Sequence, residues 1–129
     1  MSNLPERKEG LEITNDERFI KGLKLFNSAD WYKAHDLFED LWHETYGPER
    51  STIQGILQIA VAQVHLESGN TNGAKILYGE GLGRLKGSGI PDLGLNIEGL
   101  CKIVELRLNV LHQDIDLTNY ELPFLTGKL

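Results

Sequence analysis

The residues with the clearest chemical potential are a histidine and a glutamate spaced four positions apart. His35 and Glu39 fall one turn apart in a segment with a helical pattern of apolar residues, so their side chains can meet. An imidazole and a carboxylate at this spacing suit Zn²⁺, Mn²⁺ or Fe²⁺. His65, on the next helical segment, is a third candidate ligand. The first hypothesis is therefore a divalent metal site built from His35, Glu39 and His65.

The same residues allow two other interpretations. His35 and Glu39 could act as an acid and a base, with the carboxylate orienting the imidazole. Alternatively, they could belong to a structural hydrogen-bond cluster with Gln54, Gln58 and His65 that fixes the register of two helices. Residue types and spacing leave all three interpretations open.

These candidate residues depend on helices for their position. Apolar residues recur at helical spacing in five segments, which capping residues, glycine and proline separate. The pattern predicts an all-α fold, a single compact antiparallel bundle of about five helices. Residues 1–13 are expected to form a flexible N-terminal arm, and residues 14–129 a single helical domain with an irregular C-terminal tail. The predicted helices cover approximately residues 14–27, 31–46, 49–67, 70–86 and 95–112.

Short-range signals refine this architecture. Thr14 or Asn15 is expected to cap the first helix, because Glu17 stands where a capping-box acid would follow Thr14. A weak internal repeat aligns Ala34 with Ala74 and resembles the helical hairpins of tetratricopeptide-type repeats. Two units are fewer than a solenoid usually needs, so the repeat favours a bundle with tetratricopeptide-like hairpins.

Glycines interrupt the fourth predicted helix. Gly79, Gly81 and Gly83 each lower helix propensity by roughly 1 kcal/mol relative to alanine. Either a neighbouring helix packs closely against this segment or the helix is irregular.

A short Gly47-Pro48 turn should make the second and third predicted helices antiparallel neighbours. Counting outward from that turn places Gln54 and Gln58 near the level of Glu39 and His35. The sequence therefore predicts that the two glutamines are the partners of this pair at a polar edge between the helices. His65 falls nearly two turns beyond His35, about 9 Å along the axis at roughly 1.5 Å per residue.

Other residues near this edge have simpler expected roles. Arg50 begins the third predicted helix and is expected to form an ion pair with Glu39. Trp31 and Trp42 lie on the apolar side of their helix and are expected in the core, whereas His43 is expected at the surface.

Composition excludes several classes of protein. The net charge of −6 gives no basic footprint for nucleic acid and disfavours binding to an anionic membrane. No apolar run approaches a membrane span and no signal peptide is visible, so a cytoplasmic location is expected. The single cysteine, Cys101, excludes an internal disulfide and a cysteine-based zinc finger, and its apolar neighbours predict a core position.

His35, Glu39 and Trp42 follow the spacing H-x(3)-E-x(2)-W. This motif resembles the signature of a known family, the prokaryotic proteins of domain of unknown function 309, although Asp36 and Phe38 stand where the family often has Glu and Leu. The resemblance implies an all-helical bundle, a bacterial or archaeal origin and a signature suspected of metal binding, with no established activity. Further similar positions are Tyr32 to His35, Gln54 to Ala60, His65, Gly69-Asn70 and Gly73-Ala74.

Two functions from different classes follow. The first is a small metal-binding protein that uses His35, Glu39 and His65, with Trp42, Gln54, Gln58 and Arg50 in support; whether it is an enzyme is left open. The second is a non-enzymatic interaction module whose inter-helix groove or exposed apolar strip binds a peptide or a second copy in a homodimer.

Overall fold

The computed structural model describes residues 10–128, and these residues form six helices and no strand. The predicted all-α bundle is confirmed, with one helix more than the five expected. The helices are α1 (Gly10–Thr14), α2 (Glu17–Asn27), α3 (Trp31–Glu44), α4 (Glu49–Glu67), α5 (Thr71–Leu85) and α6 (Ile97–His112).

The additional helix, α1, falls at the end of the segment expected to be a loose arm. Residues 1–9 of that segment lie outside the described residues. Ile13 of α1 is fully buried. Because so short a helix is unstable by local propensity alone, burial of Ile13 against the bundle accounts for its formation.

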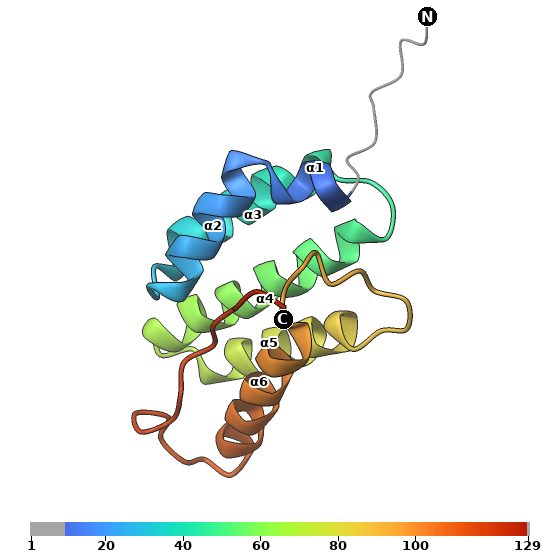
Figure 1. Ribbon diagram of the computed structural model, residues 1–129. Coiled ribbons are helices and arrows are strands. Elements are labelled where there is room, and N and C mark those ends of the chain that lie inside the picture. The colour runs from blue at the N-terminus through green and yellow to red at the C-terminus, as the bar shows by residue number, and fades with distance from the viewer. Residues whose placement is uncertain (1–9, 129) are drawn as a thin grey trace, which may run out of the picture.

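From α2 to α6, successive helices form antiparallel hairpins in the order of the chain (Figure 1). Helix α4 has the central place, because it packs most extensively against α5 and next against α3. Helix α2 packs against α3 on one side of this arrangement, and α6 packs against α5 on the other. Helix α4 therefore lies between two groups of helices.

Side chains cap three of these helices. The side chain of Asp16 accepts a hydrogen bond from the backbone N–H of Arg18 and so caps α2. The expected cap at Thr14 or Asn15 is wrong, since α1 extends to Thr14 and moves the start of the next helix forward. Asn70 and Asn96 cap α5 and α6 in the same way.

Glycine permits a close approach between α4 and α5. A Cβ atom on Gly81 would lie 3.0 Å from the carbonyl oxygen of Gly55, and a Cβ on Gly55 would lie 2.6 Å from Leu85 Cγ. Helix α5 is continuous, so close packing explains Gly81 and irregularity does not. Gly79 and Gly83 face open space, and nothing in the described fold requires glycine there.

The segment after α6, residues 115–128, crosses the bundle as an irregular C-terminal strap (Figure 1). The side-chain amide of Asn27 exchanges two hydrogen bonds of 2.8 Å with the backbone of Leu125. An isolated β-bridge pairs Leu95 with Gly127. These contacts tie the end of α2 to the loop that precedes α6.

Two further expectations concern single features. Cys101 is buried in α6, as predicted. Among α1 to α6, no helix has both the length and the apolar character needed to cross a bilayer.

Candidate functional site

The structure brings His35 and Glu39 together on α3. His35 Nε2 lies 2.7 Å from Glu39 Oε2, and His35 Nδ1 lies 3.2 Å from Asp36 Oδ1. His43, one turn further on, has its Nε2 3.7 Å from the other oxygen of Glu39. We refer to His35, Asp36, Glu39 and His43 as the α3-edge cluster. The predicted meeting of imidazole and carboxylate is therefore present.

The α3-edge cluster lines a shallow depression of about 520 Å³. Both ring nitrogens of His35 lie close to carboxylate oxygens of residues on the same helix. Within residues 10–128, no group of three or more His, Cys, Asp or Glu side chains could hold a metal ion.

Gln58 and His65 take part in other contacts. Gln58 Nε2 donates to Glu80 of α5 at 3.0 Å, and Arg84 Nε donates to Gln58 Oε1 at 3.1 Å. The expected partnership of Gln58 with His35 is wrong, because α4 turns this residue toward α5 and its complementary charges. His65 Nδ1 lies 3.2 Å from Asn70 Nδ2 at the turn between α4 and α5. Gln54 is half-buried on the same helix.

Arg50 contacts Trp42 rather than Glu39. Its guanidinium lies 4.0 Å from the centre of the Trp42 ring, which is a cation–π contact in place of the expected ion pair. Trp42 is only half-buried at the edge of the core, whereas Trp31 is fully in it, as predicted. His35, Glu39 and Trp42 share one face of α3 by their spacing, so this face adjoins the first turn of α4.

A second polar cluster lies inside the bundle, around Arg107 of α6. The Arg107 side chain is 3% exposed. Its Nε donates to the Tyr78 hydroxyl at 2.8 Å, its Nη1 to the Glu121 carbonyl at 2.9 Å and its Nη2 to Gln63 Oε1 at 3.2 Å. The Tyr78 hydroxyl in turn donates to Gln63 Oε1. We call Gln63, Tyr78 and Arg107 the Arg107 network; it joins α4, α5, α6 and the strap.

Burial changes the titration of Tyr78. Desolvation raises the pKa of Tyr78, because a buried phenolate lacks the solvation it has in water. The neighbouring positive charge of Arg107 opposes this shift without cancelling it. Tyr78 therefore stays a neutral hydrogen-bonding group well into the alkaline range.

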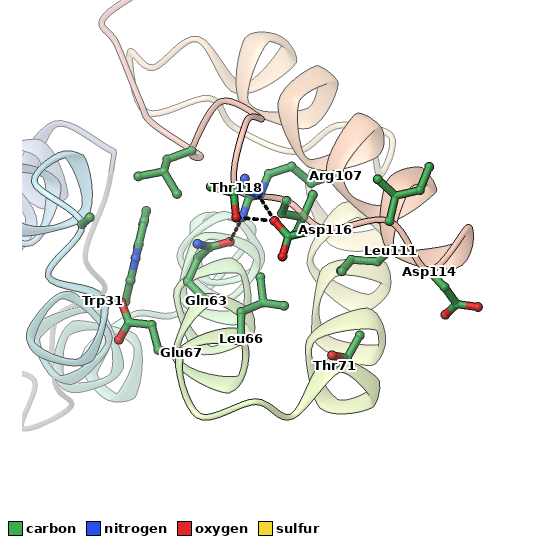
Figure 2. A pocket seen from close by; sticks show the side chains of 14 residues that line it. Trp31, Gln63, Leu66, Glu67, Thr71, Arg107, Leu111, Asp114, Asp116 and Thr118 are labelled. Atoms are coloured by element: carbon green, nitrogen blue, oxygen red, sulfur yellow. Dashed lines mark hydrogen bonds between the residues drawn. The ribbon is translucent and has the colours of Figure 1, made fainter.

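A pocket of about 630 Å³ opens beside the Arg107 network. Figure 2 shows Trp31 of α3, Leu66 of α4 and Leu111 of α6 around it, with Arg107 at one end. The strap closes another side through residues 115–118 and Leu122. The complete lining is Ala29, Trp31, Gln63, Leu66, Glu67, Thr71, Arg107, Leu111, Asp114, Ile115, Asp116, Leu117, Thr118 and Leu122.

The comparison with family profiles finds one match, described as Domain of unknown function (DUF309), over residues 9–77. This range is more than half of the 129 residues. The chain belongs to the DUF309 family. The resemblance to this family is thereby confirmed, and the family description carries no activity. No curated protein matches the chain.

The range of the DUF309 match covers one polar cluster fully and the other only in part. It includes the whole α3-edge cluster and also Gln63. It ends at residue 77, directly before Tyr78 and well before Arg107 and the strap. The pocket of this DUF309 protein is therefore built partly from residues beyond the matched range.

Arg107 is not among the site residues predicted from the sequence, although the sequence contains a signal for it. Leu100, Val104, Arg107 and Leu111 follow the spacing i, i+4, i+7 and i+11, and all four are buried. An arginine within such an apolar stripe must have specific partners, because charged side chains are almost never fully buried without them. Those partners, Gln63 and Tyr78, are far away in sequence.

Proposed function

We propose that this DUF309 protein is a ligand-binding module whose site is the pocket between Trp31 and Arg107. One observation carries the proposal: Arg107 is 3% exposed, lines the pocket and makes all three of its hydrogen bonds to neutral groups. Within residues 10–128, no ion pair involves Arg107. Buried charges are normally paired with an opposite charge. A ligand in the pocket would provide that partner.

The composition of the pocket supports this role. Ligand sites are typically concave, mostly apolar and of roughly 300–1,000 Å³, with a small number of converging polar groups. The pocket of about 630 Å³ falls in this range. Its apolar lining residues are Ala29, Trp31, Leu66, Leu111, Ile115, Leu117 and Leu122, and its internal polar groups are those of Gln63 and Arg107.

A pair of matched variants tests the site. Ile115 is 44% exposed and lines the pocket, whereas Ile76 is 60% exposed on α5 and lies outside the lining. Ile115→Trp should fill the pocket and Ile76→Trp should not. We expect compounds from a small-molecule library to raise the melting temperature of the wild-type protein and of Ile76→Trp, but not of Ile115→Trp. Equal responses of the two variants would exclude the pocket as the site.

A second candidate function is divalent metal binding at His35 and Glu39. It is supported by the 2.7 Å contact between their side chains on the face that carries the family signature. Elemental analysis of protein purified without chelator or affinity metal tests it. A stoichiometric metal that His35→Ala loses, with helicity retained, would support this function. Protein that carries no metal, or a variant that keeps it, would rule it out.

A further inference from the structure

We infer that the ligand of the pocket is the C-terminal end of a peptide, with a free carboxylate, apolar last residues and positive charge further upstream. This inference rests on the proposed function, because it names the ligand class of the same pocket. Three features carry it: the buried guanidinium, the apolar walls and the acidic rim.

The guanidinium of Arg107 is held in place and yet has hydrogen-bonding capacity left. It carries five N–H donors, and Tyr78, Glu121 and Gln63 accept three hydrogen bonds from it. In the described part of the chain, its remaining donors have no protein acceptor. A carboxylate matches the planar arrangement of guanidinium donors and would neutralise the charge.

The apolar walls of the pocket favour a ligand with apolar groups next to its carboxylate. The side chains of Trp31, Leu66 and Leu111 surround the space beside Arg107 (Figure 2). Ile115 and Leu122 of the strap are 44% and 48% exposed and extend this apolar surface outward. Apolar ligand groups would remove these side chains from water.

The rim of the pocket is acidic. Glu67, Asp114 and Asp116 line it and are exposed. Hydrogen bonds from Thr118 hold the pKa of Asp116 below its ordinary value, so this carboxylate is ionised at neutral pH. A phosphate dianion would be repelled here, and a fatty acid would leave the rim without a counter-charge. A ligand with a carboxylate at one end and a positive charge further along would match both Arg107 and the acidic rim.

The volume of the pocket favours a peptide over a free amino acid as the ligand. A pocket of about 630 Å³ accommodates several side chains, and a single amino acid would leave much of its apolar wall in contact with water. A peptide end also lets the chain continue past the rim, where lysine or arginine residues meet the carboxylates. The net charge of −6 further favours a basic partner.

Three labelled hexapeptides test the inference with the full chain by fluorescence anisotropy. The first has two lysines, a glycine and three leucines and ends in a free carboxylate. The second is its C-terminal amide, and the third has glutamates in place of the lysines. We expect the amide to bind at least about tenfold more weakly than the acid, as for loss of a charged hydrogen-bonded pair. The glutamate peptide should also bind more weakly, with a difference that widens at low salt.

Variants of the protein test which residues cause the preference for the free acid and which cause the preference for lysine. Arg107→Lys keeps the charge but loses the planar donor arrangement, so it should reduce the preference for acid over amide. Glu67→Gln combined with Asp114→Asn should reduce the preference for lysine over glutamate and leave the acid preference unchanged. If Arg107→Lys fails to fold, the comparison of the acid and the amide on the wild-type protein still tests whether a free carboxylate is required.

The outcomes separate this inference from the proposed function. Equal binding of acid and amide, or no peptide binding, would overturn the ligand class. The proposed function would survive such a result if library compounds still distinguish Ile115→Trp from Ile76→Trp. Failure of both experiments would overturn both.

Discussion

The α3-edge cluster and the Arg107 network are both polar, but they lie in opposite surroundings. In the α3-edge cluster the side chains of Glu39 and His43 are 45% and 62% exposed, and their contacts are between neighbouring turns of one helix. In the Arg107 network the side chains are buried, and their contacts join three helices and the strap. The first cluster has a recognisable sequence motif, and the second has none.

The sequence motif and the polar contacts expected to contribute most to stability therefore lie in different parts of the molecule. An exposed ion pair contributes roughly 0–1 kcal/mol, because water and salt screen it. Breaking a buried network leaves donors and acceptors unsatisfied, which costs about 1–3 kcal/mol for each group. The following predictions test this ranking, beginning with the largest effect.

Removal of the Tyr78 hydroxyl should have the largest effect. Tyr78→Phe deprives Arg107 Nε of its acceptor and Gln63 Oε1 of a donor, both buried. We expect the free energy of unfolding to fall by about 2 kcal/mol in urea titration. Tyr32→Phe is the matched control, since Tyr32 is 63% exposed. A loss below about 0.5 kcal/mol in Tyr78→Phe would show that burial does not make the network important.

The alkaline stability of the protein should report on the same residue. The pKa of Tyr78 is raised above the ordinary tyrosine value of about 10, so the folded state keeps a proton that the unfolded state releases. Stability from this group is complete below pH about 10 and is lost as the pH rises through the folded pKa. We expect wild type to lose more stability than Tyr78→Phe between about pH 9 and about pH 11. Parallel losses in the two proteins would contradict the assigned titration.

Anchoring of the strap should have an intermediate effect. Asn27→Ala removes both 2.8 Å hydrogen bonds to Leu125 at the partly buried contact between α2 and the strap. We expect a loss of about 1 kcal/mol in unfolding free energy. The Leu125 amide should also exchange with solvent much faster in hydrogen-exchange experiments. Unchanged protection of that amide would mean that other contacts hold the strap.

The α3-edge cluster should have the smallest effect. Glu39→Gln removes the carboxylate that His35 and His43 both face, but the group is 45% exposed. We expect a change within about 0.5 kcal/mol, and a still smaller one at high salt. If Glu39→Gln lowered the free energy of unfolding as much as Tyr78→Phe does, the predicted difference between the two clusters in their contribution to stability would be wrong.

The helices were largely predictable from the sequence because their ends are marked locally. Helix α4 has the predicted bounds of 49–67, between Pro48 and the Ser68-Gly69 stop, where Gly69 takes a positive φ of 79°. Helix α1 was missed because its stability comes from burial of Ile13 and not from local signals.

Contacts between site residues were predictable only where both residues lie on the same helix. The meeting of His35 and Glu39 follows from their spacing on α3. The partners of Gln58 depend on which neighbour α4 turns it toward, and the contact of Arg107 with Gln63 joins residues 44 positions apart. Such contacts are set by tertiary packing, which residue spacing does not specify.

The most direct test of the account is the ¹H–¹⁵N spectrum of the labelled protein during titration with the free-acid peptide. We predict that the side-chain resonances of Arg107 and Trp31 shift first and furthest, with the backbone amides of residues 115–118, while the backbone amides of His35 and Glu39 stay in place. Shifts confined to the α3-edge cluster, with Arg107 and Trp31 unaffected, would contradict it.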